Sequence, residues 1–78
     1  MPGSASGRHE EELESLAAEL SAIAERLADL SMQVLREAIS AGARSRPPLE
    51  RQLTRARGAV ERAVGLLSSL GEAGADDE

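Results

Sequence analysis

The stretch that decides the fold is LESLAAELSAIAERLADLSMQV, which runs from Leu13 to Val34. Its large apolar residues recur at alternating gaps of 3 and 4, at Leu13, Leu16, Leu20, Ile23, Leu27, Leu30 and Val34. This heptad spacing is typical of a helix that packs against another helix along a narrow apolar stripe. We therefore predict a helix from about Arg8 to Ala41. Gly42 should end it, because glycine adopts the left-handed conformation that stops a helix at little cost.

Small residues flank this stripe at heptad intervals, at Ala17, Ala24, Ser31 and Ala38. Small side chains let a neighbouring helix come close, because the distance between packed helices depends on the side chains at their contact. Further apolar residues, Met32, Leu35 and Ile39, lie on another side of the helix near its C-terminal end. We expect that end of the helix to be covered from two directions.

A second periodic segment follows, with apolar residues at Leu49, Leu53, Ala56, Val60, Ala63, Leu67 and Leu70. Pro48 suits the first helical position, where a backbone N–H is not needed, so we predict a helix over about 48–70. Two glycines inside it, Gly58 and Gly65, are either tolerated at the surface or mark the close approach of another helix backbone. The connection, residues 42–47, is short enough to join antiparallel neighbours. The sequence therefore predicts an all-α fold, an antiparallel helical hairpin.

The two ends of the chain differ in composition from the periodic segments. Residues 1–7 read MPGSASG and residues 71–78 read GEAGADDE, both small, polar and rich in glycine. Such segments cannot bury enough apolar surface to offset the entropy lost on ordering. We expect one hairpin domain over residues 8–70, between a disordered N-terminal tail and an acidic disordered C-terminal tail.

Two helices make a thin core, and a chain of this size gains little stability from one core. If the hairpin folds about residue 45, the first helix extends past the second by about ten residues, and Leu13 and Leu16 are left uncovered. We expect two hairpins to pair as a homodimeric four-helix bundle with coiled-coil-like contacts. The predicted self-association residues are the large members of both stripes: Leu13, Leu16, Leu20, Ile23, Leu27, Leu30, Val34, Leu49, Leu53, Val60, Leu67 and Leu70.

Charge is unevenly distributed along the chain, whose formal net charge is −5. Residues 10–37 carry eight acids and two arginines, and residues 44–62 carry six arginines and two glutamates. One interpretation is that the acidic and basic helices complement each other within the hairpin. The other is an anion-binding patch for an acidic protein or a phosphate-bearing ligand such as a nucleotide. Its residues would be Arg44, Arg46, Arg51, Arg55 and Arg57.

The composition disfavours several other functions. The chain has no Cys and no aromatic residue, and its one His, His9, has no set of ligands at metal-site spacing, so we expect no enzyme activity, cofactor or metal. The net negative charge disfavours nucleic acid and anionic membranes as partners. The first residues lack the basic and apolar regions of a signal peptide, so we expect a cytoplasmic location. The predicted function is a small protein-interaction or regulatory module.

Overall fold

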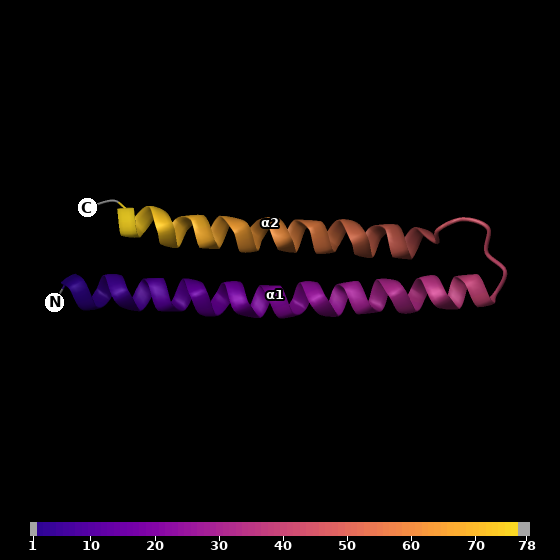
Figure 1. Cartoon of the computed structure of the whole chain (residues 1–78), viewed down its shortest axis with the longest axis horizontal. Coiled ribbons are helices and arrows are strands. Elements are labelled where there is room, and N and C mark those ends of the chain that lie inside the picture. The colour runs from indigo at the N-terminus through magenta and orange to yellow at the C-terminus, as the bar shows by residue number, and fades with distance from the viewer. Residues whose placement is uncertain (1, 77–78) are drawn as a thin grey trace.

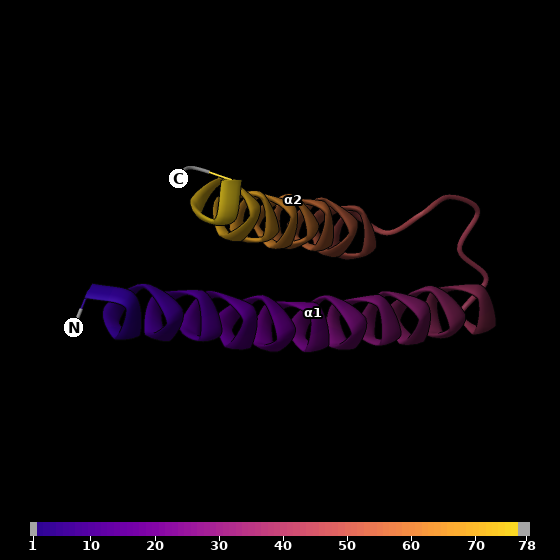
Figure 2. The ribbon, with the colours of Figure 1, turned by 60° about the vertical axis from the view of Figure 1, so that its left-hand side comes forward.

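The structure is a computed structural model that describes the backbone of residues 2–76 and the side chains of residues 9–70. It contains two helices, α1 (Pro2–Ser40) and α2 (Pro48–Asp76), joined by residues 41–47. The helices run side by side in opposite directions, so that both ends of the described chain lie at the same end of the molecule (Figures 1 and 2). The predicted all-α antiparallel hairpin is confirmed.

The molecule is a rod, with extents of 62 × 16 × 11 Å. Its radius of gyration is 17.9 Å, whereas a compact chain of this length would have one of about 11 Å. A rod made of two helices has only one line of contact between its elements. Most side chains therefore face away from the neighbouring helix.

The end of α1 follows from the properties of glycine. Gly42 has a φ of 88°, in the left-handed region that other residues rarely enter. The N–H of Gly42 donates to the carbonyl oxygen of Ile39 at 3.0 Å, and the N–H of Ala43 donates to that of Ala38 at 2.9 Å. This pair of bonds is a Schellman motif, which satisfies carbonyl groups at the end of the helix. The prediction that Gly42 ends the helix is confirmed.

The start of α2 follows from its two prolines. Pro48 is the first helical residue, as its fixed φ and missing N–H predict. Pro47 precedes the helix, and its carbonyl oxygen accepts the N–H of Arg51 at 3.2 Å. The short connection, residues 41–47, thus reverses the chain direction so that α2 runs back along α1.

Both helices run further than the sequence predicted. In the segments predicted as disordered tails, residues 2–7 belong to α1 and residues 71–76 to α2, while residues 1, 77 and 78 lie outside the described residues. Once a helix has formed, each added residue gains one hydrogen bond, so it can continue past its packed part. Leu13, which the sequence predicted to be uncovered, is half-buried, whereas Leu16 remains 43% exposed.

The contact between the helices uses only one half of each predicted stripe. On α1, the half-buried members are Leu13, Leu20, Leu27 and Val34. On α2, the large half-buried members are Leu53, Val60 and Leu67, and Ala63 is half-buried at the edge of the contact. The other half of the α1 stripe, Leu16, Ile23 and Leu30, remains 43–44% exposed. The small residues take its place: Ala24 and Ser31 are only 6% and 8% exposed. Close approach at these small residues turns the remaining leucines and the isoleucine out of the contact.

The core of the hairpin is correspondingly thin. Among the described side chains, Ala24 is the only buried hydrophobic residue, and none is fully buried. An apolar side chain contributes stability in proportion to the area that it removes from water. The hairpin therefore leaves much of its apolar surface available for further burial.

Candidate interaction surface

The two long flanks of the hairpin differ in chemistry. We define the apolar flank by the stripe residues that lie outside the helix–helix contact, Leu16, Ile23, Leu30, Leu49, Ala56, Ala63 and Leu70. We define the ion-pair flank by the polar side chains that line the other edge of α2, Arg46, Glu50, Thr54, Arg57 and Glu61. The first is apolar from Leu16 to Leu30 on α1 and from Leu49 to Leu70 on α2, and the next position of the α1 stripe is the exposed Glu37. The second is closed by hydrogen bonds and ion pairs.

The α1 and α2 parts of the apolar flank lie on the same side of the molecule. Residues seven apart stand almost above one another on a helix, so each stripe follows one line. A groove on the ion-pair flank is lined by Ala24 and Ala28 of α1 together with Arg57, Glu61 and Val64 of α2. On each helix the apolar stripe lies across the contact line from these groove residues. The two stripes therefore border the same flank.

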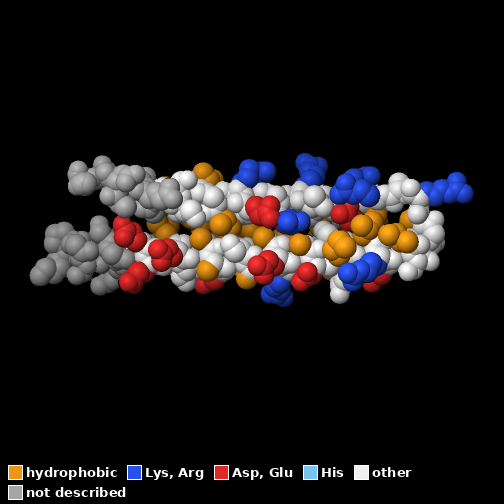
Figure 3. Space-filling view, in the orientation of Figure 1, with side chains coloured by type: hydrophobic (Ala, Val, Ile, Leu, Met, Phe, Trp, Pro, Cys, Tyr) orange, Lys and Arg blue, Asp and Glu red, His pale blue; other side chains and the backbone are white. Residues whose placement is uncertain are grey.

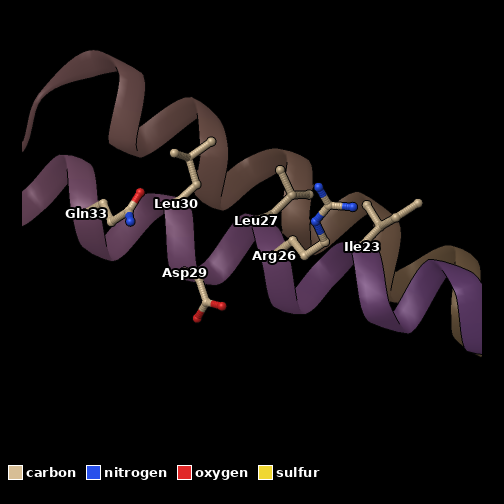
Figure 4. Close-up of a pocket in the computed structure, with 6 residues that line it drawn as sticks. All are labelled: Ile23, Arg26, Leu27, Asp29, Leu30 and Gln33. Atoms are coloured by element: carbon tan, nitrogen blue, oxygen red, sulfur yellow. The ribbon is translucent and has the colours of Figure 1, made fainter.

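The α1 part of this flank forms an open depression. It is lined by Ile23, Leu27 and Leu30 together with the polar residues Arg26, Asp29 and Gln33. Figure 4 shows Ile23, Leu27 and Leu30 directed toward the same side, whereas Asp29 points away from them. Leu27 continues into the contact with α2, so exposed and half-buried apolar side chains form one surface.

The α2 part of the flank alternates large and small residues. Leu49 and Leu70 are more than half exposed, Ala56 is exposed, and Ala63 is half-buried. Of the twelve predicted self-association residues, the structure leaves five exposed: Leu16, Ile23, Leu30, Leu49 and Leu70. The other seven lie half-buried. The described hairpin thus divides the predicted set between an internal contact and an open surface.

The ion-pair flank is organised by a buried carboxylate, Glu50, which is 7% exposed. The Nε of Arg46 donates to its Oε1 at 2.6 Å, and the hydroxyl of Thr54 donates to its Oε2 at 3.1 Å. The hydrogen bond from Arg46 lowers the pKa of Glu50 below its ordinary value, against the effect of burial. A second pair joins Arg57 Nε to Glu61 Oε2 at 3.0 Å.

The predicted arginine patch is only partly available as a site. Arg46 and Arg57 are paired with glutamates of their own segment, whereas Arg44, Arg51 and Arg55 are exposed and form no ion pair with a described residue. Arg62, which sequence reasoning did not include, shares the outer face of α2 with the last two. Spacings of 4 and 7 from Arg51 to Arg55 to Arg62 would have indicated this.

The predicted charge segregation is visible on the surface. Figure 3 shows basic side chains along the outer edge of α2 and acidic side chains mostly on α1. The two edges of the rod therefore carry opposite charge. A partner that packs across both helices would therefore contact the mostly acidic α1 and the mostly basic α2.

Other kinds of site find little support in the part of the chain that the structure describes. No group of three or more His, Asp or Glu side chains gathers there in a way that could hold a metal ion. Neither described helix is long and apolar enough to span a membrane. The comparisons with known proteins give no family: no family model, no curated protein and no solved structure matches the chain. Its function must be inferred from its own surfaces.

Proposed function

We propose that this protein is a non-enzymatic interaction module that assembles as a homodimer, two hairpins forming a four-helix bundle through the apolar flank. The observation that carries the proposal is the combination of large exposed apolar residues along one flank with a nearly absent core. Leu16, Ile23 and Leu30 are almost half exposed in a hairpin whose only buried hydrophobic residue, among those described, is Ala24. Monomeric soluble proteins rarely expose large contiguous apolar patches.

Dimer formation would supply what the hairpin lacks. Burying a Leu or Ile side chain from full exposure stabilises by ~1.5–3 kcal/mol, so a half-exposed one adds about 1 kcal/mol. In a symmetric dimer this stabilisation is gained twice for every such residue, because both copies bury the same surface. The exposed residues are spread along the rod, and the gain is therefore distributed over the whole length of the bundle.

The test is a pair of charge insertions on α1, followed by sedimentation velocity. Ile23→Glu places a carboxylate in the centre of the apolar flank, and we expect it to weaken the dimer by about tenfold or more. Ala18→Glu is the matched control, because Ala18 is exposed on the side of α1 that faces neither α2 nor the partner hairpin. Equal weakening by both variants, or by neither, would contradict the proposal.

A second candidate function is supported by the arginines that have no ion-pair partner among the described residues. Arg51, Arg55 and Arg62 form a stripe that could bind an acidic protein surface or a phosphate-bearing ligand, with Arg44 at the turn. Poly-glutamate and tripolyphosphate, titrated separately, would distinguish the two ligand classes. Replacing the three stripe residues by Gln should abolish the binding of whichever probe binds. Unchanged binding, or no binding of either probe, would eliminate this candidate.

A further inference from the structure

We propose that, within this dimer, α1 of each hairpin packs against α2 of its partner around a two-fold axis parallel to the helices. The proposal rests on the proposed function, because it specifies how the apolar flank is used. It names a second copy of this chain as the occupant of that flank. It also fixes which helices meet, which the presence of a dimer alone does not.

Two symmetric arrangements can bring the apolar flanks of two hairpins face to face. A two-fold axis parallel to the helices places α1 over the partner's α2. An axis across the helices places α1 over the partner's α1, and α2 over the partner's α2. Both arrangements make every neighbouring pair antiparallel, so helix direction does not choose between them.

Charge distinguishes the two arrangements. Residues 10–37 of α1 carry a net charge of −6, whereas residues 44–62, in the turn and α2, carry +4. Pairing α1 with the partner's α2 brings opposite charges together, while the other arrangement brings like charges together along both helix pairs. Each exposed pair contributes only up to ~1 kcal/mol, and Arg26 and Arg36 of α1 oppose the trend, so the preference comes from the net charges of the two segments.

Few charges lie directly beside the apolar flank. On α1, Glu12 and Glu19 lie four residues before Leu16 and Ile23, whereas Arg26, four residues before Leu30, lines the apolar depression itself. On α2, Arg55 and Arg62 lie on the outer face, and the residues four positions before Ala56, Ala63 and Leu70 carry no charge. The two glutamates of α2 whose side chains are described, Glu50 and Glu61, are both engaged on the opposite flank. No described acid of α2 therefore faces Glu12 or Glu19 of the partner's α1.

Side-chain size gives a second, independent reason. The groove is lined by residues between 21 and 28 of α1 and between 57 and 64 of α2, which run in opposite directions, so Ile23 and Ala63 stand at about the same level. Moving one heptad along each helix places Leu30 level with Ala56. Rotation about an axis parallel to the helices keeps each residue at its level.

At these two levels a large residue of α1 would therefore face a small residue of the partner's α2. Such alternation of large and small residues is what fills a helical core. In the other arrangement, the alanines of the two α2 helices would face each other and leave the interface poorly filled. Charge and size thus favour the same arrangement.

Disulfide formation between single-cysteine chains tests the arrangement, since the natural chain has no Cys. A disulfide requires Cα atoms within ~7 Å, which neighbouring helices of a bundle allow and diagonal ones do not. We expect a mixture of Ile23→Cys and Ala63→Cys chains to give mainly the mixed dimer on oxidation. Each variant alone should cross-link several-fold less, no more than Ala18→Cys, whose cysteine lies on the outer side of α1.

Two outcomes would overturn the arrangement. One is efficient cross-linking of Ile23→Cys or Ala63→Cys with itself, as α1-to-α1 or α2-to-α2 packing requires. The other is a mixture that cross-links no better than the Ala18→Cys control although the unoxidised chains sediment as dimers. If the unmodified chain sediments as a monomer, the proposed function itself fails, so the two failures are distinguishable.

Discussion

The two flanks of this hairpin lie on either side of the same helix–helix contact, yet different residues cover the contact on each flank. On the ion-pair flank, Glu50 and Glu61 accept hydrogen bonds from Arg46 and Arg57 and cover the edge of the contact with polar groups. On the apolar flank, exposed leucines and an isoleucine continue the contact outward. This difference is the reason why we propose that the second copy packs on the apolar flank rather than on the ion-pair flank.

The largest expected effect comes from placing a charge on each flank in turn. Leu30 and Met32 are nearly equally exposed, at 44% and 48%, but Leu30 belongs to the apolar flank and Met32 lies four residues after Ala28, on the ion-pair flank. We expect Leu30→Glu to raise the dimer dissociation constant by about tenfold or more, and Met32→Glu to change it by less than about twofold. Dilution series in sedimentation velocity would measure both.

If Met32→Glu weakens the dimer as much as Leu30→Glu does, the distinction between the flanks is wrong. If neither variant has an effect, self-association does not use the described apolar surface. A helical circular dichroism spectrum for each variant is the control that the hairpin still forms.

The contact between the flanks offers a stabilising change. Ser31 is buried against α2, and its hydroxyl has no hydrogen-bond partner among the described residues. Removing an unsatisfied buried polar group is favourable, and Ala also has the higher helix propensity. We expect Ser31→Ala to raise the free energy of unfolding by ~1–2 kcal/mol, measured by urea unfolding followed at 222 nm. A loss of stability would show that the hydroxyl is needed in the contact.

The turn at Gly42 determines which residues of α1 and α2 lie opposite each other, and its stability can be tested by substitution. Ala at Gly42 must adopt the observed φ of 88°, and we expect Gly42→Ala to destabilise by ~1 kcal/mol. Gly65→Ala is the matched control. An added Cβ there meets nothing within 4 Å, so the change should stabilise α2 by up to ~1 kcal/mol. Thermal unfolding of both variants would check the opposite signs.

The smallest effect concerns the ion-pair flank and depends on pH. Because the pKa of Glu50 is lowered in the folded chain, its contribution to stability is present above the ordinary carboxyl pKa of 4.5 and is lost as pH falls through the lowered value. We expect Glu50→Gln to reduce the melting temperature by a few degrees at neutral pH. This difference should narrow below pH 4.5. A difference that is constant across that range would mean that the charge of Glu50 plays no part.

The hairpin itself could be predicted because its signals are local. Heptad spacing, the proline pair before α2 and Gly42 each act over a few residues, and the structure agrees with all three. Gly58 and Gly65, for which two interpretations stood open, have no helix backbone close to them in the described hairpin. The space beside both glycines fits tolerance at the surface of α2.

The rotation of the helices about their own axes could not be predicted from the same pattern. A heptad stripe does not say whether Leu16 or Ala17 will face the neighbour, because both lie beside Leu13 and Leu20. Close approach at the small residues decides this, and it is a property of the pair of helices rather than of either one. The helix ends at 2 and 76 were missed because residues 2–7 and 71–76 contain no large apolar residue at helical spacing.

The most direct test of the proposed homodimer is the mass of the unmodified chain in solution. Sedimentation equilibrium with interference optics suits a protein that has no aromatic residue to absorb near 280 nm. We expect a helical species at micromolar concentration with twice the chain mass of 8.2 kDa. A species that stays helical with the mass of a single chain would contradict it, because the apolar flank would then be stable in water without a second copy.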